Sequence, residues 1–248
     1  MNSSELIQAN IHNLTSLWET AGTPFQSYVK GTDYDYCVIP NSDWPNRLWF
    51  NGEIDGEKAI KSALDKMASS STDLMLPLWD IYDNGYHQYL EEHGCRELFE
   101  LLGMTLQLGN PFEEQGRLDI SLVSSEEDAR LWSDIYPQAF GYRISRAILL
   151  ETLGDINFYL ACYQGQPVGT AIQFNTANVS GIHGVGVIPE MRRRGFAGEI
   201  MKFVLNRAID AKADYATLQA SEMGKGLYLK MGFEEQFSIK HYGLESRN

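Results

Sequence analysis

The chain has 248 residues, 44% of them hydrophobic and 12% aromatic, which is enough apolar side chain for one large domain or two of ordinary size. Its net charge of −13 argues against general binding to nucleic acid, and no apolar run approaches the length of a membrane span. Cys37, Cys95 and Cys162 are an odd set without CxxC spacing, so the sequence indicates neither a disulfide framework nor a metal site such as zinc. The first ten residues lack the pattern of a secretory signal, and we expect a cytoplasmic protein.

The first 117 residues carry most of the negative charge, with 18 acidic against 7 basic residues. Helical spacing or composition predicts three helices in this part, at Leu6–Thr20, Glu57–Ala68 and Tyr86–Leu102, the last interrupted near Gly94. Extended apolar runs predict strands at Tyr34–Ile39, Arg47–Phe50, Leu74–Ile81 and Met104–Leu108. Asn110–Arg117 combines proline, glycine and charge, and we expect a domain boundary there.

Residues 118–248 are close to neutral, with 13 basic and 15 acidic residues. Strands are expected at Leu118–Val123, Asn157–Tyr163, Val168–Asn175, Gly184–Ile188, Tyr215–Ala220 and Phe237–Tyr242, with a turn at Asn178–Gly181. Helices are expected at Glu126–Gln138, Ser145–Leu153 and 196–212. The last helix joins two extended segments, a crossover that makes neighbouring strands parallel. We therefore expect an α/β (α+β) fold with a mixed, mostly antiparallel sheet flanked by helices.

The stretch Val185–Gly198, VGVIPEMRRRGFAG, holds the most informative local pattern. An apolar run ends at Pro189, a basic run follows, and small residues then precede a helical pattern. The first N–H groups of a helix lack intrahelical partners and carry the positive end of its dipole, so this pattern favours phosphate binding. An ordinary helix start beside a solvated basic run is the alternative.

Two motifs together resemble a known family. Arg192-x-x-Gly195-x-Ala197, five residues after Val187, resembles the pyrophosphate loop of the GNAT-type N-acetyltransferases. Leu227-Tyr228-x-x-x-Gly232-Phe233 resembles the second motif of that family, and a helix and a strand separate the two motifs as the family requires. The resemblance covers about residues 118–245. It implies an acyl-CoA N-acyltransferase-like fold in which two parallel strands splay apart to admit acetyl-CoA.

The resemblance also implies which residues surround acetyl-CoA. Val185 and Val187 would follow the pantetheine arm, and the pyrophosphate would lie on Arg192, Arg193, Arg194, Gly195, Phe196, Ala197 and Gly198. Members often carry asparagine at the end of the fifth strand, where this chain has Ser221, followed by Gly224 where alanine is usual. Because serine reaches less far than asparagine, the contact of Ser221 with the arm is in doubt.

Acetyl transfer to an amine requires the amine to lose a proton and the departing thiolate to gain one. Tyr228 matches the tyrosine that commonly protonates the thiolate in the family, although it could instead be a half-buried packing residue. The candidate bases are His183, Glu222 and Glu190. In a regular strand His183 would face the same side as Val185 and Val187, but a lone strand histidine is more often structural.

Residues 1–115 can be read as a degenerate copy of the GNAT domain expected at 118–248, or as an unrelated helical cap. The glycines of the segments ending Gly94-Cys95 and Gly232-Phe233 align, and Leu90 then stands where Tyr228 does. The proposed copy has no arginine–glycine loop before its helix at Glu57–Ala68.

The sequence thus predicts an acetyl-CoA-dependent N-acetyltransferase acting on the primary amine of a small molecule or peptide. No metal, membrane or nucleic acid is expected, and both a monomer and a homodimer are open. The alternative is a catalytically inactive acyl-CoA-binding module with a regulatory or sensing role. The acceptor is not named by the sequence. For Arg143, a surface ion pair is favoured over the recognition of an acceptor carboxylate.

Overall fold

The computed structural model describes residues 1–81 and 85–245, so the last three residues of the expected C-terminal half lie outside the described residues. Its centre is an eight-stranded sheet in the order β4-β11-β5-β10-β9-β8-β7-β6. The strands are β4 (Leu76–Trp79), β5 (Cys95–Gln107), β6 (Asp119–Leu122), β7 (Asn157–Tyr163), β8 (Gln166–Thr176), β9 (Val179–Val187), β10 (Tyr215–Ala220) and β11 (Glu234–Leu244). Of the pairs in this sheet only β9 and β10 run parallel. The predicted mixed, mostly antiparallel sheet is confirmed.

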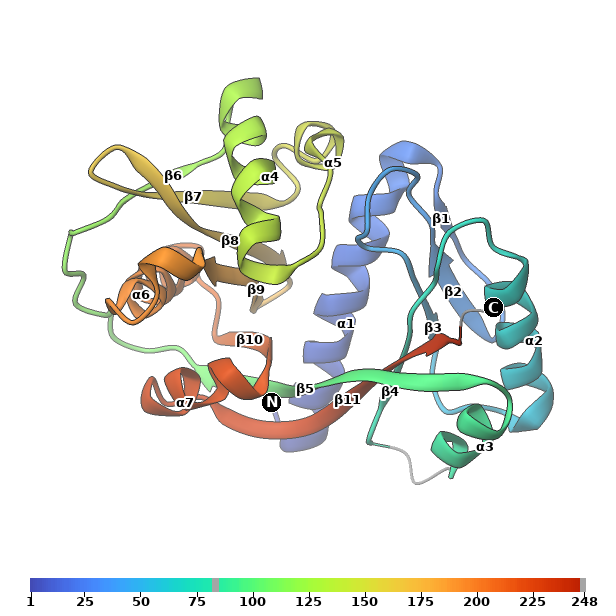
Figure 1. Ribbon diagram of the computed structural model, residues 1–248. Coiled ribbons are helices and arrows are strands. Elements are labelled where there is room, and N and C mark those ends of the chain that lie inside the picture. Colours follow the sequence, from blue (N-terminus) through green and yellow to red (C-terminus); the bar gives the residue numbers. More distant parts are fainter. Residues whose placement is uncertain (82–84, 246–248) are drawn as a thin grey trace.

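Helices cover both faces of the sheet (Figure 1). One face carries α1 (Ser3–Gly22), α4 (Glu126–Phe140) and α5 (Arg146–Glu151), whose apolar side chains share one core cluster with β7 and β8. The other face carries α6 (Phe196–Asp210) and α7 (Glu222–Lys230). The apolar stripe of α6 is buried there, with Ile200, Val204 and Leu205 each 0% exposed. Within the described ranges, no helix combines the length and apolarity needed to cross a bilayer.

A smaller three-stranded sheet lies beside the first, made of β1 (Tyr28–Val29), β2 (Tyr34–Cys37) and β3 (Arg47–Phe50). A short 3-10 turn, η1 (Thr23–Phe25), connects α1 to it. Helix α2 (Gly56–Ser69) leads from β3 towards β4, and a parallel bridge between Arg47 and Met75 joins the two ends. The β3–α2–β4 segment therefore repeats the crossover of β9–α6–β10 in a reduced form.

The predicted helix Tyr86–Leu102 is wrong over most of its second half. Helix α3 (Tyr86–Glu92) stops before Gly94, which adopts a left-handed φ of +82°, and the chain continues as the 13-residue strand β5. β5 pairs with β10 on one side and with β11 on the other. Because both partners come from the far end of the chain, tertiary pairing overrides the local helical spacing.

Other boundaries also differ from the sequence-based expectation. β9 begins at Val179, where a turn was expected, because Val179 and Ser180 pair with both β8 and β10. β11 is longer at both ends than the predicted Phe237–Tyr242.

The two long strands β5 and β11 join the N-terminal and C-terminal parts of the chain into one sheet. β5, from the N-terminal part, lies between β10 and β11, and β11, from the C-terminal part, lies between β5 and β4 (Figure 1). Each is preceded by a short helix and a glycine of left-handed φ, Gly94 at +82° and Gly232 at +94°. The aligned positions Leu90 and Tyr228 differ in burial, because Leu90 is 0% exposed whereas Tyr228 is partly exposed.

Candidate active site

The parallel strands β9 and β10 separate after three paired positions. Tyr215, Ala216 and Thr217 pair with Val179, Ser180 and Gly181. Beyond them β9 continues to Val187 beside β8, and β10 continues to Ala220 beside β5. The edge of β9 at residues 182–187 therefore has no strand partner on its β10 side, and the sheet opens there as a V.

A β-bulge lies in this open part of β9. Ile172 of β8 pairs with His183 and Thr170 with Gly186, so two residues of β9 oppose one of β8. Gly184 has a φ of +55°, and a Cβ there would lie 3.2 Å from the ring of Tyr136. A bulge changes which face the following side chains occupy.

The expectation that His183 shares a face with Val185 and Val187 is therefore wrong. Both valines pack in the cluster on the α6 side of the sheet. His183 instead reaches Asn13 of α1, on the opposite side.

The loop between β9 and α6 contains a 3-10 turn, η2 (Pro189–Met191), and ends at Gly195, the N-cap of α6. Arg193 and Gly195 adopt left-handed φ angles of +62° and +83°. Among the described residues, the backbone N–H groups of 193–198 have no hydrogen-bond acceptor. A Cβ added to Gly198 would lie 3.5 Å from the Leu227 side chain of α7. The start of α6 therefore lies against α7 across the opening.

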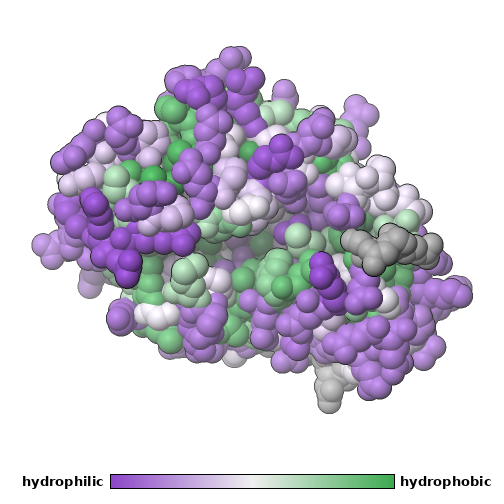
Figure 2. Space-filling model, in the orientation of Figure 1, coloured by the Kyte–Doolittle hydropathy of each residue, from purple (hydrophilic) through white to green (hydrophobic). Residues whose placement is uncertain are grey.

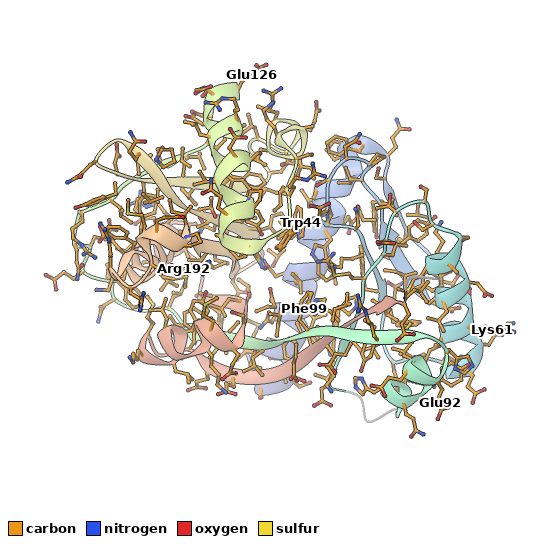
Figure 3. The ribbon with its side chains drawn as sticks, in the orientation of Figure 1. Trp44, Lys61, Glu92, Phe99, Glu126 and Arg192 are labelled. Atoms are coloured by element: carbon orange, nitrogen blue, oxygen red, sulfur yellow. The ribbon has the colours of Figure 1, made fainter. Side chains whose placement is uncertain are left out.

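The first loop arginine holds the loop in place. Arg192 donates from Nε to the Val187 carbonyl and from Nη2 to the Ala139 carbonyl, both at 3.1 Å. Its guanidinium thus ties the loop to the end of β9 and to α4. Figure 3 shows Arg192 beside the start of α6. Arg193 and Arg194 are exposed, whereas Phe196 is 2% exposed, so it can offer a ligand only its backbone.

A buried carboxylate that the sequence analysis missed supports the same loop through an ion pair and two backbone N–H groups. The Glu199 carboxylate accepts the N–H groups of Arg117 at 2.7 Å and Leu118 at 2.8 Å, and Arg117 Nε at 2.9 Å. Arg117 Nη1 in turn donates to the Arg194 carbonyl at 3.0 Å. The sequence signal that could have revealed this contact is the acidic residue Glu199, directly before the buried apolar stripe of α6. Glu199 is 5% exposed.

Tyr228 lies in α7 at the other side of the opening. Its ring packs edge-on against Phe233 with a centroid distance of 5.9 Å, and burial raises the pKa of its hydroxyl to about 12. A Cβ on Gly224 would come within 3.0 Å of the Tyr228 ring, so the glycine makes room for the tyrosine. Ser221 caps α7 by accepting the Gly224 N–H at 3.4 Å, and Glu222 is exposed at the first helical position.

His183 belongs to a polar network that joins α1 to both splayed strands. Its Nδ1 lies 3.0 Å from Gln219 Oε1 on β10, and its Nε2 lies 3.2 Å from Asn13 Oδ1. Burial lowers the pKa of His183 to about 4, against a smaller opposing effect of the Gln219 hydrogen bond. A neutral imidazole has one N–H and can donate to only one of these oxygens. Asn10, also on α1 and 0% exposed, accepts from Gln219 Nε2 at 2.7 Å.

Aromatic residues at and just after the end of α4 belong to the core cluster that also includes α1. The hydroxyls of Tyr136 and Tyr142 are 2.6 Å apart, and Phe140 stacks on Tyr136 at 4.4 Å. Arg143 Nε lies 3.5 Å from Asp43 Oδ2 at the surface, so the predicted surface ion pair of Arg143 is confirmed. No group of three or more His, Cys, Asp or Glu side chains in the described part could hold a metal ion.

Comparison with known families gives a match to the acetyltransferase (GNAT) domain over residues 154–235. These residues contain the splayed strands, the loop before α6 and α7. No curated protein matches the chain.

Solved structures share the fold over most of the chain. A GCN5-related N-acetyltransferase from Kribbella flavida has a TM-score of 0.70 at 18% identity, covering 95% of this chain and 96% of that one. A GCN5-related N-acetyltransferase from Sphaerobacter thermophilus has a TM-score of 0.63 at 18% identity, covering 87% and 78%. A tandem GNAT protein from the clavulanic acid biosynthesis pathway has a TM-score of 0.57 at 11% identity, covering 87% and 79%. The chain therefore has a GNAT fold, and residues 154–235 in its C-terminal half match the acetyltransferase (GNAT) domain.

Proposed function

We propose that the protein transfers the acetyl group of acetyl-CoA to the primary amine of a small molecule or peptide. The observation that carries this proposal is the opening between β9 and β10, which lies beside the unpartnered N–H groups at the start of α6. The match of residues 154–235 to the acetyltransferase (GNAT) domain supports an acyl-CoA-dependent N-acetyltransferase at the level of the family.

The pyrophosphate would lie on the backbone N–H groups of residues 193–198, at the positive end of the α6 dipole. The exposed Arg193 and Arg194 would add positive charge, while Arg192 keeps the loop in position through two carbonyls. The pantetheine arm would run along the open edge of β9 at Val185 and Val187. Because the Val187 carbonyl already accepts from Arg192, pairing there would rely on the second lone pair of that oxygen or on an N–H.

Tyr228 is the proposed acid for the departing thiolate. From a hydroxyl of pKa about 12 to a thiol of ordinary pKa about 8.5, proton transfer is unfavourable by about 5 kcal/mol. Burial raises the pKa of a thiol for the same reason, so this gap narrows for a thiolate enclosed beside Tyr228. Ser221 would have little freedom to reach the arm, because its hydroxyl caps α7.

Glu222 is the better placed of the candidate bases, acting through water from the exposed start of α7. His183 combines a pKa of about 4 with contacts on both ring nitrogens, which is unlike a base that must take a proton near neutral pH. We therefore assign His183 to positioning α1 over the opening. The low pKa of His183 and the contacts on both of its ring nitrogens also favour the second candidate function. That function is a cofactor-binding regulatory or sensing module without turnover.

We further propose that residues 1–115 are a degenerate copy of the GNAT domain at 118–248. The β3–α2–β4 crossover and the α3–β5 segment correspond to β9–α6–β10 and α7–β11. The N-terminal loop before α2 is acidic, with Asp55 as the N-cap and Glu57 in the first turn, so it would repel a phosphate. Since β5 already fills the space between β10 and β11, the sheet needs no second chain, which favours a monomer over a homodimer.

Two measurements test the proposed function. Acetyl-CoA at 100 times its dissociation constant should stabilise the protein by about 2.7 kcal/mol in thermal unfolding. Release of the CoA thiol should then depend on an added amine, measured with a thiol reagent over a panel of amino acids, amino-acid amides, simple amines and short peptides. Stabilisation without amine-dependent thiol release would favour the regulatory module. No stabilisation at millimolar acetyl-CoA would contradict both.

A further inference from the structure

Arg47, the first residue of β3, is a cation inside an apolar core. Arg47 is 6% exposed. It lies on the same face of β3 as Trp49, whereas Leu48 lies on the opposite face and packs towards α2. Within residues 1–81 and 85–245, no carboxylate lies within ion-pair distance of its guanidinium. A buried charge without a counter-ion is costly, so this arrangement calls for an anion from outside the chain.

The hydrogen bonds of Arg47 leave one edge of the guanidinium unused. Nη1 donates to the Asn46 carbonyl at 3.0 Å. Nε is buried without a partner, and Nη2 has no partner in the described part of the chain. The Nε–Nη2 edge binds both oxygens of a carboxylate side-on. Arg130 of this chain shows that geometry at the surface, with Nε and Nη2 at 2.9 and 2.7 Å from the two oxygens of Glu127.

The titratable side chains that respond to the charge of Arg47 are themselves uncharged. The charge of Arg47 opposes the raised pKa values of Tyr136 and Tyr142, and together with burial it lowers the pKa of His241 to about 3, so all three lie near it. His241 is 3% exposed, its Nδ1 has no hydrogen-bond partner among the residues that the structure describes, and its ring stacks on Phe99 at 4.3 Å. The site thus offers a carboxylate one cation and several neutral hydrogen-bonding groups.

The site adjoins the opening between β9 and β10. The ring of Tyr136 lies 3.2 Å from the Cβ position of Gly184 in the bulge, while its hydroxyl binds Tyr142 near Arg47. Tyr136 therefore packs its ring at the bulge, while its hydroxyl responds to the charge of Arg47. Phe99 is 38% exposed over His241. Figure 2 shows the surface hollowed in the middle of this face, and Figure 3, in the same orientation, labels Arg192 on one side of that region and Phe99 and Trp44 on the other.

We propose that Arg47 binds the carboxylate of the acceptor, and that the acceptors are free amino acids. This inference rests on the proposed acetyl transfer and narrows its substrate class. A free amino acid carries its amine and its carboxylate on one carbon, so a carboxylate bound at Arg47 would fix the position of the amine, whereas in a peptide a flexible chain separates the two groups. The Arg143 guanidinium, which the sequence offered for such a role, is at the surface on Asp43.

The test compares each of a panel of L-amino acids with its carboxamide, which keeps the side chain and the amine and removes the negative charge. The amine of an amide is more often deprotonated at neutral pH, so intrinsic reactivity favours the amide. We expect kcat/KM for the acids to exceed that for the amides by about 10²-fold, as for a site whose buried polar groups the wrong substrate leaves unpaired. Equal values for the two series in the wild-type protein overturn the proposal.

Variants assign the effect to Arg47. In Arg47→Met the ratio of kcat/KM for acid to that for amide should fall to one or below, since intrinsic reactivity favours the amide, and Arg47→Lys, which keeps the charge and loses the bidentate edge, should give an intermediate ratio. Arg143→Met should keep the wild-type ratio. A preference for acids that survives in a folded Arg47→Met protein overturns the proposal. If Arg47→Met does not fold, the wild-type comparison of acids with amides decides alone.

Thermal unfolding separates this inference from the proposed function, because it needs no turnover. Amino acids should raise the melting temperature of the wild-type protein, whereas their amides should not, and the rise should vanish in Arg47→Met. With that result but no acetyl transfer to any amine, the Arg47 site stands and the transferase function falls. Transfer to amines without any preference for acids, in rate or in melting temperature, leaves the function standing and overturns the Arg47 site.

Discussion

Replacing Glu199 tests the support of the phosphate loop. Both backbone N–H groups, of Arg117 and Leu118, bind Oε1, whereas Arg117 Nε binds Oε2. Glu199→Ala leaves two N–H groups without an acceptor, at about 1–3 kcal/mol each. The Arg117 side chain is 41% exposed, so water can replace its contact. We expect a loss of unfolding free energy of about 3–4 kcal/mol.

Glu199→Gln is the matched control, since its amide oxygen can keep both backbone contacts and only the Arg117 Nε contact is lost. Its expected cost is about 1 kcal/mol. Urea unfolding followed by circular dichroism measures both variants, with an unchanged m-value as the sign that only stability changed. Equal losses in the two variants, or a loss below about 1 kcal/mol in Glu199→Ala, would refute the assignment of Oε1 as the acceptor of both N–H groups.

Three further results are expected. Tyr228→Phe keeps the packing on Phe233 and removes the acid, so kcat should fall by about 10²-fold or more with acetyl-CoA affinity unchanged; an unaltered kcat would exclude Tyr228 as the acid. His183 is neutral when folded and has a pKa of about 4, below its ordinary 6.5, so unfolding free energy should fall by about 3 kcal/mol as pH drops from 6.5 to 4. Urea unfolding should show less of this fall in His183→Gln, and an identical pH dependence would contradict the burial. Arg192→Lys cannot hold both carbonyls and should weaken acetyl-CoA binding about tenfold, whereas Arg193→Lys should not; calorimetry that shows equal affinities for both would contradict the distinction.

The features that the sequence predicted correctly are local ones. The buried stripe of α6, with Ile200 and Val204, follows from helical spacing, and the loop before it follows from Gly195 and the basic run. The mixed sheet follows from the crossover between two extended segments. Each of these patterns lies within some twenty residues of contiguous chain.

The features that the sequence could not predict depend on distant partners or on backbone irregularities. Helical spacing predicts a helix over residues 95–102 of β5, because the partners of β5, β10 and β11, lie more than a hundred residues away, whereas Met104–Leu108 is correctly expected as a strand. His183 was placed on the wrong face because one extra residue at Gly184 reverses the alternation. Arg47 appeared only as the start of an extended run, since its burial beside His241 requires both halves of the chain.

Calorimetric titration with acetyl-CoA tests the central claim, that the start of α6 is the one cofactor site. The double variant Arg194→Glu with Gly195→Asp reverses charge at the loop and adds a side chain at a φ of +83°, at a stability cost on the order of 1 kcal/mol. Gly52→Asp is the control, because it adds the same side chain before α2, where a Cβ meets nothing within 4 Å. We predict one site per chain in the wild-type and Gly52→Asp proteins and none in the folded double variant. Stoichiometric binding by the folded double variant would contradict the account and place acetyl-CoA elsewhere.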